Sequence, residues 1–221
     1  MTLYSFIEGP LLWIALLTFT IGTVLKVCWL LSISLKKDKI IYQHLNWKYI
    51  FISIVHWLLP LHKDVSKNPL FTILSYIFHI CLIVVPIWLE AHIMLWKESW
   101  LGWSWAPIPS GLADWMTLFC IVIGLYLLAR RIVSRDIRFI STPSDYILII
   151  VTLLPFATGY FLSHGTLNSF SFLNRNMEIV HMLSAEILLI VIPFTKLSHF
   201  ILFFLSRGAT GVEFGRRGVS I

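Results

Sequence analysis

The chain has 221 residues, of which 58% are hydrophobic and 13% are charged, and its formal net charge is +6 at pH 7. A soluble domain carries about a quarter charged residues, so this composition excludes a disordered chain, a linker protein and a water-soluble enzyme. The apolar residues occur in blocks long enough to cross a bilayer, which takes about 20 residues of helix. The sequence therefore predicts a multi-pass membrane protein with one domain over residues 1–221.

Apolar blocks in five places predict transmembrane helices. A sixth stretch, at about 42–61, carries His44, Lys48 and His56 among its apolar residues, which favours a helix lying in the membrane interface. The expected fold is thus an all-α bundle of five transmembrane helices plus one interfacial helix. The expected bounds of the five are about 9–32, 68–96, 112–133, 145–163 and 178–205.

The Lys and Arg residues between the blocks predict the orientation. Thirteen lie in the connections at 35–67 and 130–142 and in the tail after residue 205, against two in the other connections. The positive-inside rule then places the N-terminus outside and the C-terminus in the cytoplasm, in the cell inner (cytoplasmic) membrane. Topology accounts for the basic residues, so no nucleic-acid partner is expected.

Histidines in two of the blocks carry the expected chemistry. His79 and His92 lie in the second block, and His181 and His199 in the fifth. Ionisable side chains at membrane depth are costly and usually mark a function. Because the two helices run in opposite directions, His92 and His181 are expected near the outer surface and His79 and His199 near the inner one. This arrangement predicts two b-type haems, each ligated by one histidine from each helix. The alternative is core histidines bonded to Ser, Thr or backbone.

On straight helices the two histidine pairs would be aligned differently. Five turns separate His181 from His199, which places both on one face about 27 Å apart. The 13-residue spacing of His79 and His92 does not align them on a straight helix. Pro86 between them predicts a kink that restores the alignment.

The remaining histidines have weaker assignments. His44, His56 and His62 belong to the expected interfacial helix or its end, with a third haem on His56 as the alternative. His164 lies in an outer connection, where it is either solvated or a proton acceptor for quinol.

Three cysteines, Cys28, Cys81 and Cys120, lie inside apolar blocks and are expected to be small buried hydrophobic residues. No C-x-x-C-H motif occurs, which excludes covalent c-type haem attachment.

The string PFTKLSH at 193–199, with His181 upstream, resembles the last helix of the gamma-subunit family of respiratory nitrate reductases. In that family a Pro-Phe pair, a hydroxyl residue, a base, Leu and the haem-ligand His follow one another. Phe78-His79 and the link from Ala129 to Tyr146 extend the resemblance. Within the family, Pro86, the 13-residue spacing and FFLSRG at 203–208 are most similar to the cytochrome b subunit of the high-molecular-weight cytochrome c (Hmc-type) complex of sulfate reducers.

The resemblance implies His79, His92, His181 and His199 as axial ligands of two haem b. It implies an electron-transfer subunit of an oxidoreductase complex in anaerobic respiration and sulfate reduction, rather than a stand-alone enzyme. The implied partners are a periplasmic multihaem cytochrome c, a cytoplasmic heterodisulfide-reductase-like iron–sulfur protein and other membrane subunits. The alternatives are a quinol-oxidising or quinone-reducing membrane anchor and a non-redox scaffold or transporter.

Cations near the inner surface are candidates to bind the haem propionates. Lys196 lies one turn before His199, and Arg130 and Arg131 are expected at the same surface, although topology alone also explains the arginines. The basic tail (Arg207, Arg216 and Arg217) and the 130–138 loop are expected to form a cytoplasmic docking face.

Polar residues near the outer surface are candidates for a menaquinone site beside the outer haem, covered by the tryptophans at 100–105. Asp114 and Asp145 have an alternative, which is to cap the helices that follow them. The candidate residues are Glu90, Lys97, Asp114, Glu178 and His164.

Overall fold

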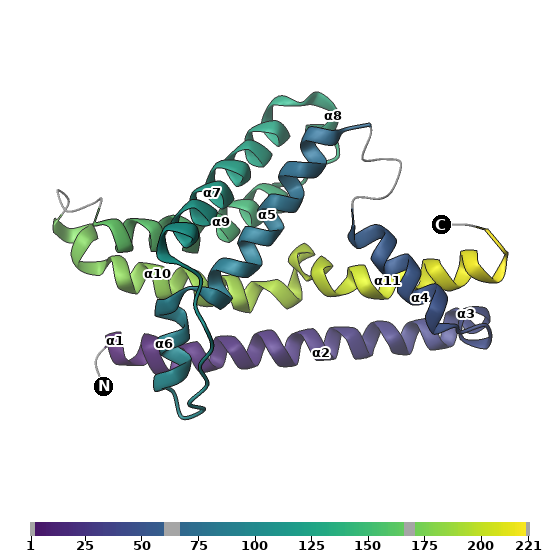
Figure 1. The fold of residues 1–221 in the computed structure, drawn as a ribbon, viewed down its shortest axis with the longest axis horizontal. Coiled ribbons are helices and arrows are strands. Elements are labelled where there is room, and N and C mark those ends of the chain that lie inside the picture. The colour runs from purple at the N-terminus through teal and green to yellow at the C-terminus, as the bar shows by residue number, and fades with distance from the viewer. Residues whose placement is uncertain (1–2, 60–66, 166–170, 220–221) are drawn as a thin grey trace. The chain divides into compact units, whose positions relative to one another are not determined.

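The computed structural model describes residues 3–59, 67–165 and 171–219, without the side chains of 171–175. Every regular element in these ranges is a helix (Figure 1). In chain order the elements are α1 (Leu3–Phe6), η1 (Ile7–Leu11), α2 (Leu12–Lys37), α3 (Lys39–Gln43), α4 (Trp47–Leu58), α5 (Pro69–Trp88), α6 (Glu90–Glu98), α7 (Ser110–Val133), α8 (Arg135–Phe139), α9 (Pro143–His164), α10 (Ser171–Val191), η3 (Ile192–Phe194), η4 (Lys196–Ser198) and α11 (His199–Arg216).

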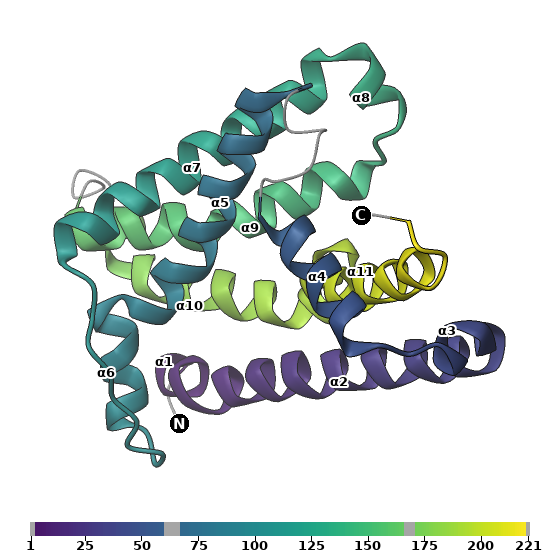
Figure 2. The same cartoon turned by 45° about the vertical axis from the view of Figure 1, so that its right-hand side comes forward.

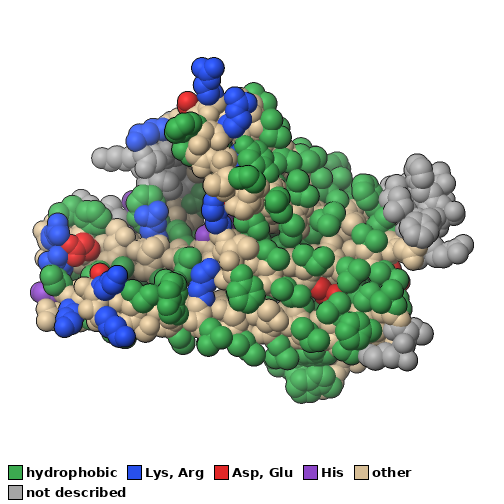
Figure 3. Space-filling model, turned by 180° about the vertical axis from the view of Figure 1, so that it is seen from behind, with side chains coloured by type: hydrophobic (Ala, Val, Ile, Leu, Met, Phe, Trp, Pro, Cys, Tyr) green, Lys and Arg blue, Asp and Glu red, His purple; other side chains and the backbone are tan. Residues whose placement is uncertain are grey.

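Five helical segments of the described ranges are long and apolar enough to cross a membrane: Leu3–Lys37, Pro69–Trp88, Ser110–Val133, Pro143–His164 and Asn176–Phe194. Each overlaps one predicted block, so the prediction of a multi-pass membrane protein is confirmed. Large apolar side chains cover much of the visible helix surface (Figure 3), and Leu25 and Val122 remain 62% and 61% exposed. Exposed apolar side chains of this kind are expected on helices that cross a bilayer. The orientation of the chain in the membrane stays a prediction.

Two predicted helices are interrupted. The second, expected at 68–96, ends at Trp88, and an extended residue, Leu89, separates α5 from α6. The fifth, expected at 178–205, ends at Val191 because Pro193 has no N–H for the helix ladder. Two 3₁₀ turns around the extended Thr195 follow, so the prediction of one continuous fifth helix is wrong. The straight-helix distance between His181 and His199 therefore does not apply.

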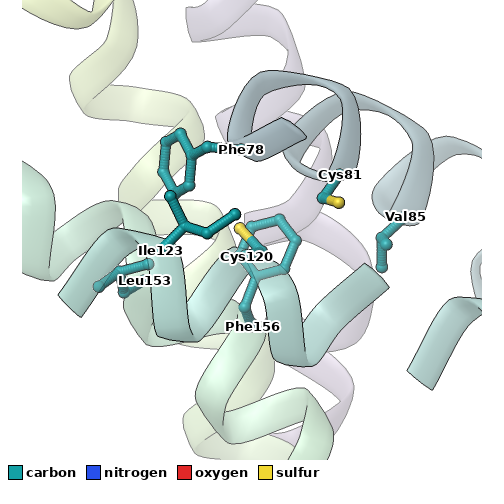
Figure 4. Close-up of a cluster of buried hydrophobic side chains, with 7 residues drawn as sticks. All are labelled: Phe78, Cys81, Val85, Cys120, Ile123, Leu153 and Phe156. Atoms are coloured by element: carbon teal, nitrogen blue, oxygen red, sulfur yellow. The ribbon is translucent and has the colours of Figure 1, made fainter. Parts of the chain in front are cut away.

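The chain divides into two compact units, which we describe separately: Met1–Pro69 with Glu186–Ile221, and Leu70–Ala185. The second unit is built on α5, α7 and α9, whose buried side chains meet in one cluster (Figure 4). Gly124 on α7 lies directly against the Leu153 side chain of α9, so these helices approach closely. The cluster contains Phe78, Cys81, Val85, Cys120, Ile123, Leu153 and Phe156.

In the first unit, α4 packs across α11 at an oblique angle (Figure 2), and α2 contacts η3 and α11. Gly211 of α11 lies against the Tyr49 carbonyl, and the Ser53 hydroxyl donates to the Arg207 carbonyl at 2.7 Å. The Arg207 guanidinium lies 3.9 Å from the centre of the Trp57 ring. The sequence predicted one helix at about 42–61, but the structure has two, α3 up to Gln43 and α4 from Trp47 to Leu58, with residues 44–46 outside any helix. The interfacial position of this stretch stays a prediction, and its end at 60–61 lies outside the described residues.

Candidate functional site

The imidazole rings of His92 on α6 and His181 on α10 lie together, as the sequence predicted. Their centroids are 6.1 Å apart and their planes are 9° from parallel. Metal–imidazole nitrogen bonds are about 2 Å long, so two imidazoles on opposite sides of one metal ion have ring centres on the order of 6 Å apart. The observed distance between the ring centroids is of this size.

The break at Leu89 positions His92. The last carbonyls of a helix have no partner within it, and each must find another donor when it lies away from water. Here every one of the last four carbonyls of α5 has a donor, two of them from the loop after α6. The pairs are Leu89 N with Val85 O (3.0 Å), His92 Nδ1 with Pro86 O (3.0 Å), Trp105 Nε1 with Ile87 O (2.9 Å) and Ile108 N with Trp88 O (3.0 Å).

Backbone carbonyls also fix the tautomers of three of the predicted ligands. A carbonyl oxygen only accepts, so a histidine bonded to it carries its proton on Nδ1 and leaves the Nε2 lone pair for a metal. The donating nitrogens are Nδ1 of His79 to Ser75 O (2.7 Å), Nδ1 of His92 to Pro86 O (3.0 Å) and Nδ1 of His199 to Lys196 O (3.0 Å).

His181 is also expected to carry its proton on Nδ1, in this case through a hydrogen bond to a side chain of α9. The Thr158 hydroxyl donates to the Leu154 carbonyl at 2.8 Å, so towards His181 Nδ1, 3.2 Å away, its oxygen is an acceptor. Gly159, the next residue of α9, also lies against this ring, since an added Cβ would lie 2.9 Å from Cε1 of His181. His181 is therefore oriented by Thr158 and given room by Gly159.

His92 lies on α6, outside the membrane-spanning segments. Burial lowers the pKa of its imidazole below the usual range, and the hydrogen bond to the Pro86 carbonyl opposes this shift. Neutral imidazole is the form that binds a metal ion.

The other predicted ligand pair lies in different units, so each residue is described alone. His79 is exposed on α5 and makes an edge contact with the Phe78 ring, 5.6 Å between centroids. His199 is exposed and is the first residue of α11. Their pairing stays a prediction.

The predicted propionate ligands have different surroundings. Lys196 is exposed in η4. The Arg130 guanidinium lies 4.4 Å from the centre of the Phe71 ring. Arg131 donates to the Ser141 hydroxyl at 2.9 Å. The structure thus places both arginines against other groups of their own unit.

The two aspartates expected to cap helices differ in outcome. Asp145, at the third position of α9, forms a capping box with Thr142 and accepts from its backbone N–H at 2.8 Å, which confirms that prediction. Asp114 lies one turn inside α7, which begins at Ser110, so its capping prediction is wrong. Its carboxylate instead lies 3.6 Å from Nε2 of His164.

The other candidate residues differ in exposure and in the rings they contact. Glu90 and Lys97 are exposed on α6, and Trp103 stacks on Trp96 at 6.3 Å. His44 is exposed, and the His56 ring makes an edge contact with Trp57 at 5.9 Å. His62 lies outside the described residues.

The three cysteines also differ. Cys81 and Cys120 are buried, as predicted. Cys28 is exposed on α2, so the prediction of burial is wrong for it. It lies two residues after Lys26, which is about 200° around the helix from the side that faces η3.

Lys26 was assigned no role from the sequence, yet its ammonium group donates hydrogen bonds to the non-helical segment before His199. Nζ lies 2.9 Å from the Pro193 carbonyl and 2.6 Å from the Ser198 hydroxyl. The signal in the sequence was a base in the middle of the first apolar block, where an unpaired charge is costly.

Fold and site together define a multi-pass helical membrane protein with a paired-histidine site. The chain is 34% identical over 223 residues to a protein of Nitratidesulfovibrio vulgaris strain Hildenborough that is described only as "Protein". The alignment covers 98% of this chain and 96% of that protein, and the chain belongs to the same family as it. No protein-family model matches the chain, and no solved structure matches it.

Proposed function

We propose that the chain is a dihaem b-type cytochrome subunit that carries electrons across the cytoplasmic membrane. In this proposal His92 and His181 ligate an outer haem, and His79 and His199 ligate an inner one. The observation that carries it is the pair of nearly parallel rings of His92 and His181, 6.1 Å apart. The subunit passes electrons within a respiratory complex and is not a stand-alone enzyme.

The ligand set supports haem over a metal held by protein alone. In the ranges that the structure describes, no three His, Cys, Asp or Glu side chains cluster as metal ligands. Two histidines suffice for haem because the porphyrin supplies the other four nitrogens, and the bound iron then supplies a one-electron redox centre. The chain's own contribution is to orient the imidazoles, through the Pro86 carbonyl for His92 and the Thr158 hydroxyl for His181.

The proposed partners follow from the resemblance described above. Electrons pass between a periplasmic multihaem cytochrome c or the menaquinone pool and a cytoplasmic heterodisulfide-reductase-like iron–sulfur protein, within an anaerobic sulfate-reducing pathway. The proposed cytoplasmic docking face includes Arg216 and Arg217, both of which pair with Glu213. Reversing both arginine charges is expected to weaken binding of the iron–sulfur partner and to leave the haem spectra unchanged. Retention of that partner at high salt in this variant would place docking elsewhere.

The test of the proposal is haem content and its dependence on single histidines. Reduced-minus-oxidised spectra and pyridine haemochrome counting on the purified native complex are expected to give two haem b for this chain. H92A and H181A are each expected to lose the same haem, and H79A and H199A the other. H44A is the matched control, because His44 Nδ1 also lies 3.0 Å from a backbone carbonyl, that of Ile40. A protein with no b-type α band would overturn the proposal.

A second candidate, quinone chemistry on the chain itself, is favoured by one contact. Asp114 Oδ2 and His164 Nε2 lie 3.6 Å apart, and the Tyr160 ring stacks on His164 at 4.2 Å. A carboxylate beside an imidazole is able to accept protons from quinol. A menaquinol analogue is expected to shift only the His92–His181 haem signal, and D114N to abolish that shift. A shift confined to the other haem would contradict this placement, and no shift would favour direct transfer from cytochrome c.

A further inference from the structure

The segment between α10 and α11 closes the last membrane-spanning segment, Asn176–Phe194, and directly precedes His199. Ile192–Phe194 and Lys196–Ser198 form 3₁₀ turns, and Thr195 between them is extended. Carbonyl groups in such a segment lose their helical donors, and each requires another where it lies away from water.

Lys26 of α2 provides these donors. Its Nζ lies 2.9 Å from the Pro193 carbonyl, 3.5 Å from the Thr195 carbonyl and 2.6 Å from the Ser198 hydroxyl. An ammonium group has three donors, and here three oxygens of one short segment accept them. Hydrogen bonds from a charged donor are stronger than neutral ones, which offsets part of the cost of a charge at this depth.

The face of α2 that carries Lys26 also contacts the break and the start of α11 through two other residues. Phe19, Gly22 and Lys26 are spaced i, i+3, i+7 and so share one side of the helix. The Phe19 ring stacks on Phe200 with centroids 6.0 Å apart. An added Cβ on Gly22 would lie 2.9 Å from Cβ of Pro193, so only glycine lets α2 approach the break this closely.

The same break determines the position of the His199 ring. Ser198, which binds Lys26, is 1% exposed and directly precedes His199. His199 Nδ1 lies 3.0 Å from the Lys196 carbonyl, which belongs to the second 3₁₀ turn. A shift of this turn therefore changes both the start of α11 and the acceptor that orients the imidazole.

We propose that Lys26 is a positioning residue for His199, acting by clamping the 192–198 break through Pro193, Thr195 and Ser198. The proposal rests on the proposed function only in taking His199 as a haem ligand. The clamp itself is a property of the protein and can be measured without haem.

The experiment compares K26M, K26R and K36M in the full-length protein within its complex. Lys36 is an exposed base of the same helix and provides the matched control. Hydrogen exchange in the 194–199 peptide is expected to be about tenfold faster in K26M than in K36M, since the clamp's charge-assisted bonds are lost. K26R, which retains charge and donors, is expected to restore most of the protection. G22A, which retains Lys26 but displaces Pro193, is expected to give an intermediate rate.

The second measurement is the low-spin electron paramagnetic resonance signal of each haem. K26M is expected to shift or broaden the signal that H199A removes and to leave the signal that H92A removes unchanged. Exchange and signal equal to those of K36M would overturn the proposal while leaving the cytochrome assignment standing. A wild-type protein without haem would instead refute the proposed function. The exchange rates of K26M and K36M would then still show whether Lys26 stabilises the 192–198 break.

Discussion

The ring of His181 lies directly against Gly159, so that a Cβ built on Gly159 would lie 2.9 Å from Cε1 of the imidazole. These residues belong to α9 and α10, and the contact sets how closely the ring approaches the backbone of α9. The neighbouring Thr158 accepts the Nδ1 proton of the same ring. Two adjacent residues of α9 thus fix both the position and the tautomer of His181.

Gly159→Ala is expected to displace the His181 ring and to weaken haem binding at the His92–His181 site by about 10–100-fold, the effect typical of losing a group that orients a metal ligand. Haem titration of the apoprotein measures this. Gly111→Ala is the control, since nothing lies within 4 Å of an added Cβ there. Equal affinities of the two variants would show that the Gly159 contact does not position His181.

Trp105→Phe is expected to destabilise the protein by about 1–3 kcal/mol, because it leaves the Ile87 carbonyl at the end of α5 without its donor. Unfolding in mixed micelles measures the change in free energy. Trp103→Phe keeps an aromatic ring against Trp96 and is expected to cost less. If both variants have the same free energy of unfolding, the hydrogen bond from the indole N–H of Trp105 does not stabilise the end of α5.

Gly124 and Leu153 are expected to be energetically coupled because they touch between α7 and α9. Gly124→Ala overpacks this contact at a cost of about 1–3 kcal/mol, and Leu153→Ala leaves a cavity at about 2–5 kcal/mol. The double variant is expected to lose less than the sum, since the new Cβ enters the space that Leu153 vacates. Strict additivity in a double-mutant cycle would contradict the close approach of the two helices.

The last turn of α11 is expected to loosen in acid. The hydrogen bond from Arg216, together with the charges of Arg216 and Arg217, holds the pKa of Glu213 below its usual range. Stability from a carboxyl with a lowered pKa is fully present above the unfolded value, about 4.3, and is lost as pH falls through the folded one. The protection of the 213–219 amides from hydrogen exchange, relative to an unfolded chain at the same pH, is therefore expected to fall below about pH 4.

Glu213→Gln is expected to show the reduced protection already at pH 7. In this variant the protection of the 213–219 amides is expected not to change further as pH falls. Glu98→Gln, at the end of α6, leaves the arginine pairs intact and provides the control. If the protection of these amides in the wild-type protein does not change with pH, the ion pairs of Glu213 do not stabilise the last turn of α11.

All five membrane-spanning helices are predictable from the sequence because long apolar blocks leave few alternatives in a chain of this composition. The sequence also paired His92 with His181, since depth in opposed helices follows from chain direction alone. Pro86 predicts a kink in the second helix, but the break itself, at Leu89, and the break at 192–198 were not predicted. Their carbonyls are satisfied by distant donors, Trp105 in one case and Lys26 in the other, and no local pattern in the sequence connects these partners.

The residues joining α6 to α7 illustrate a consequence for evolution of the family. Surface loops ordinarily tolerate insertions and deletions. In this loop, however, Trp105 and Ile108 reach back to the carbonyls of Ile87 and Trp88, so the number of residues between them is fixed by the geometry of the α5 terminus. Among natural relatives, changes in length are expected to gather at the tip near Gly102, which has a φ of 63°, and to be absent between Trp105 and Ile108.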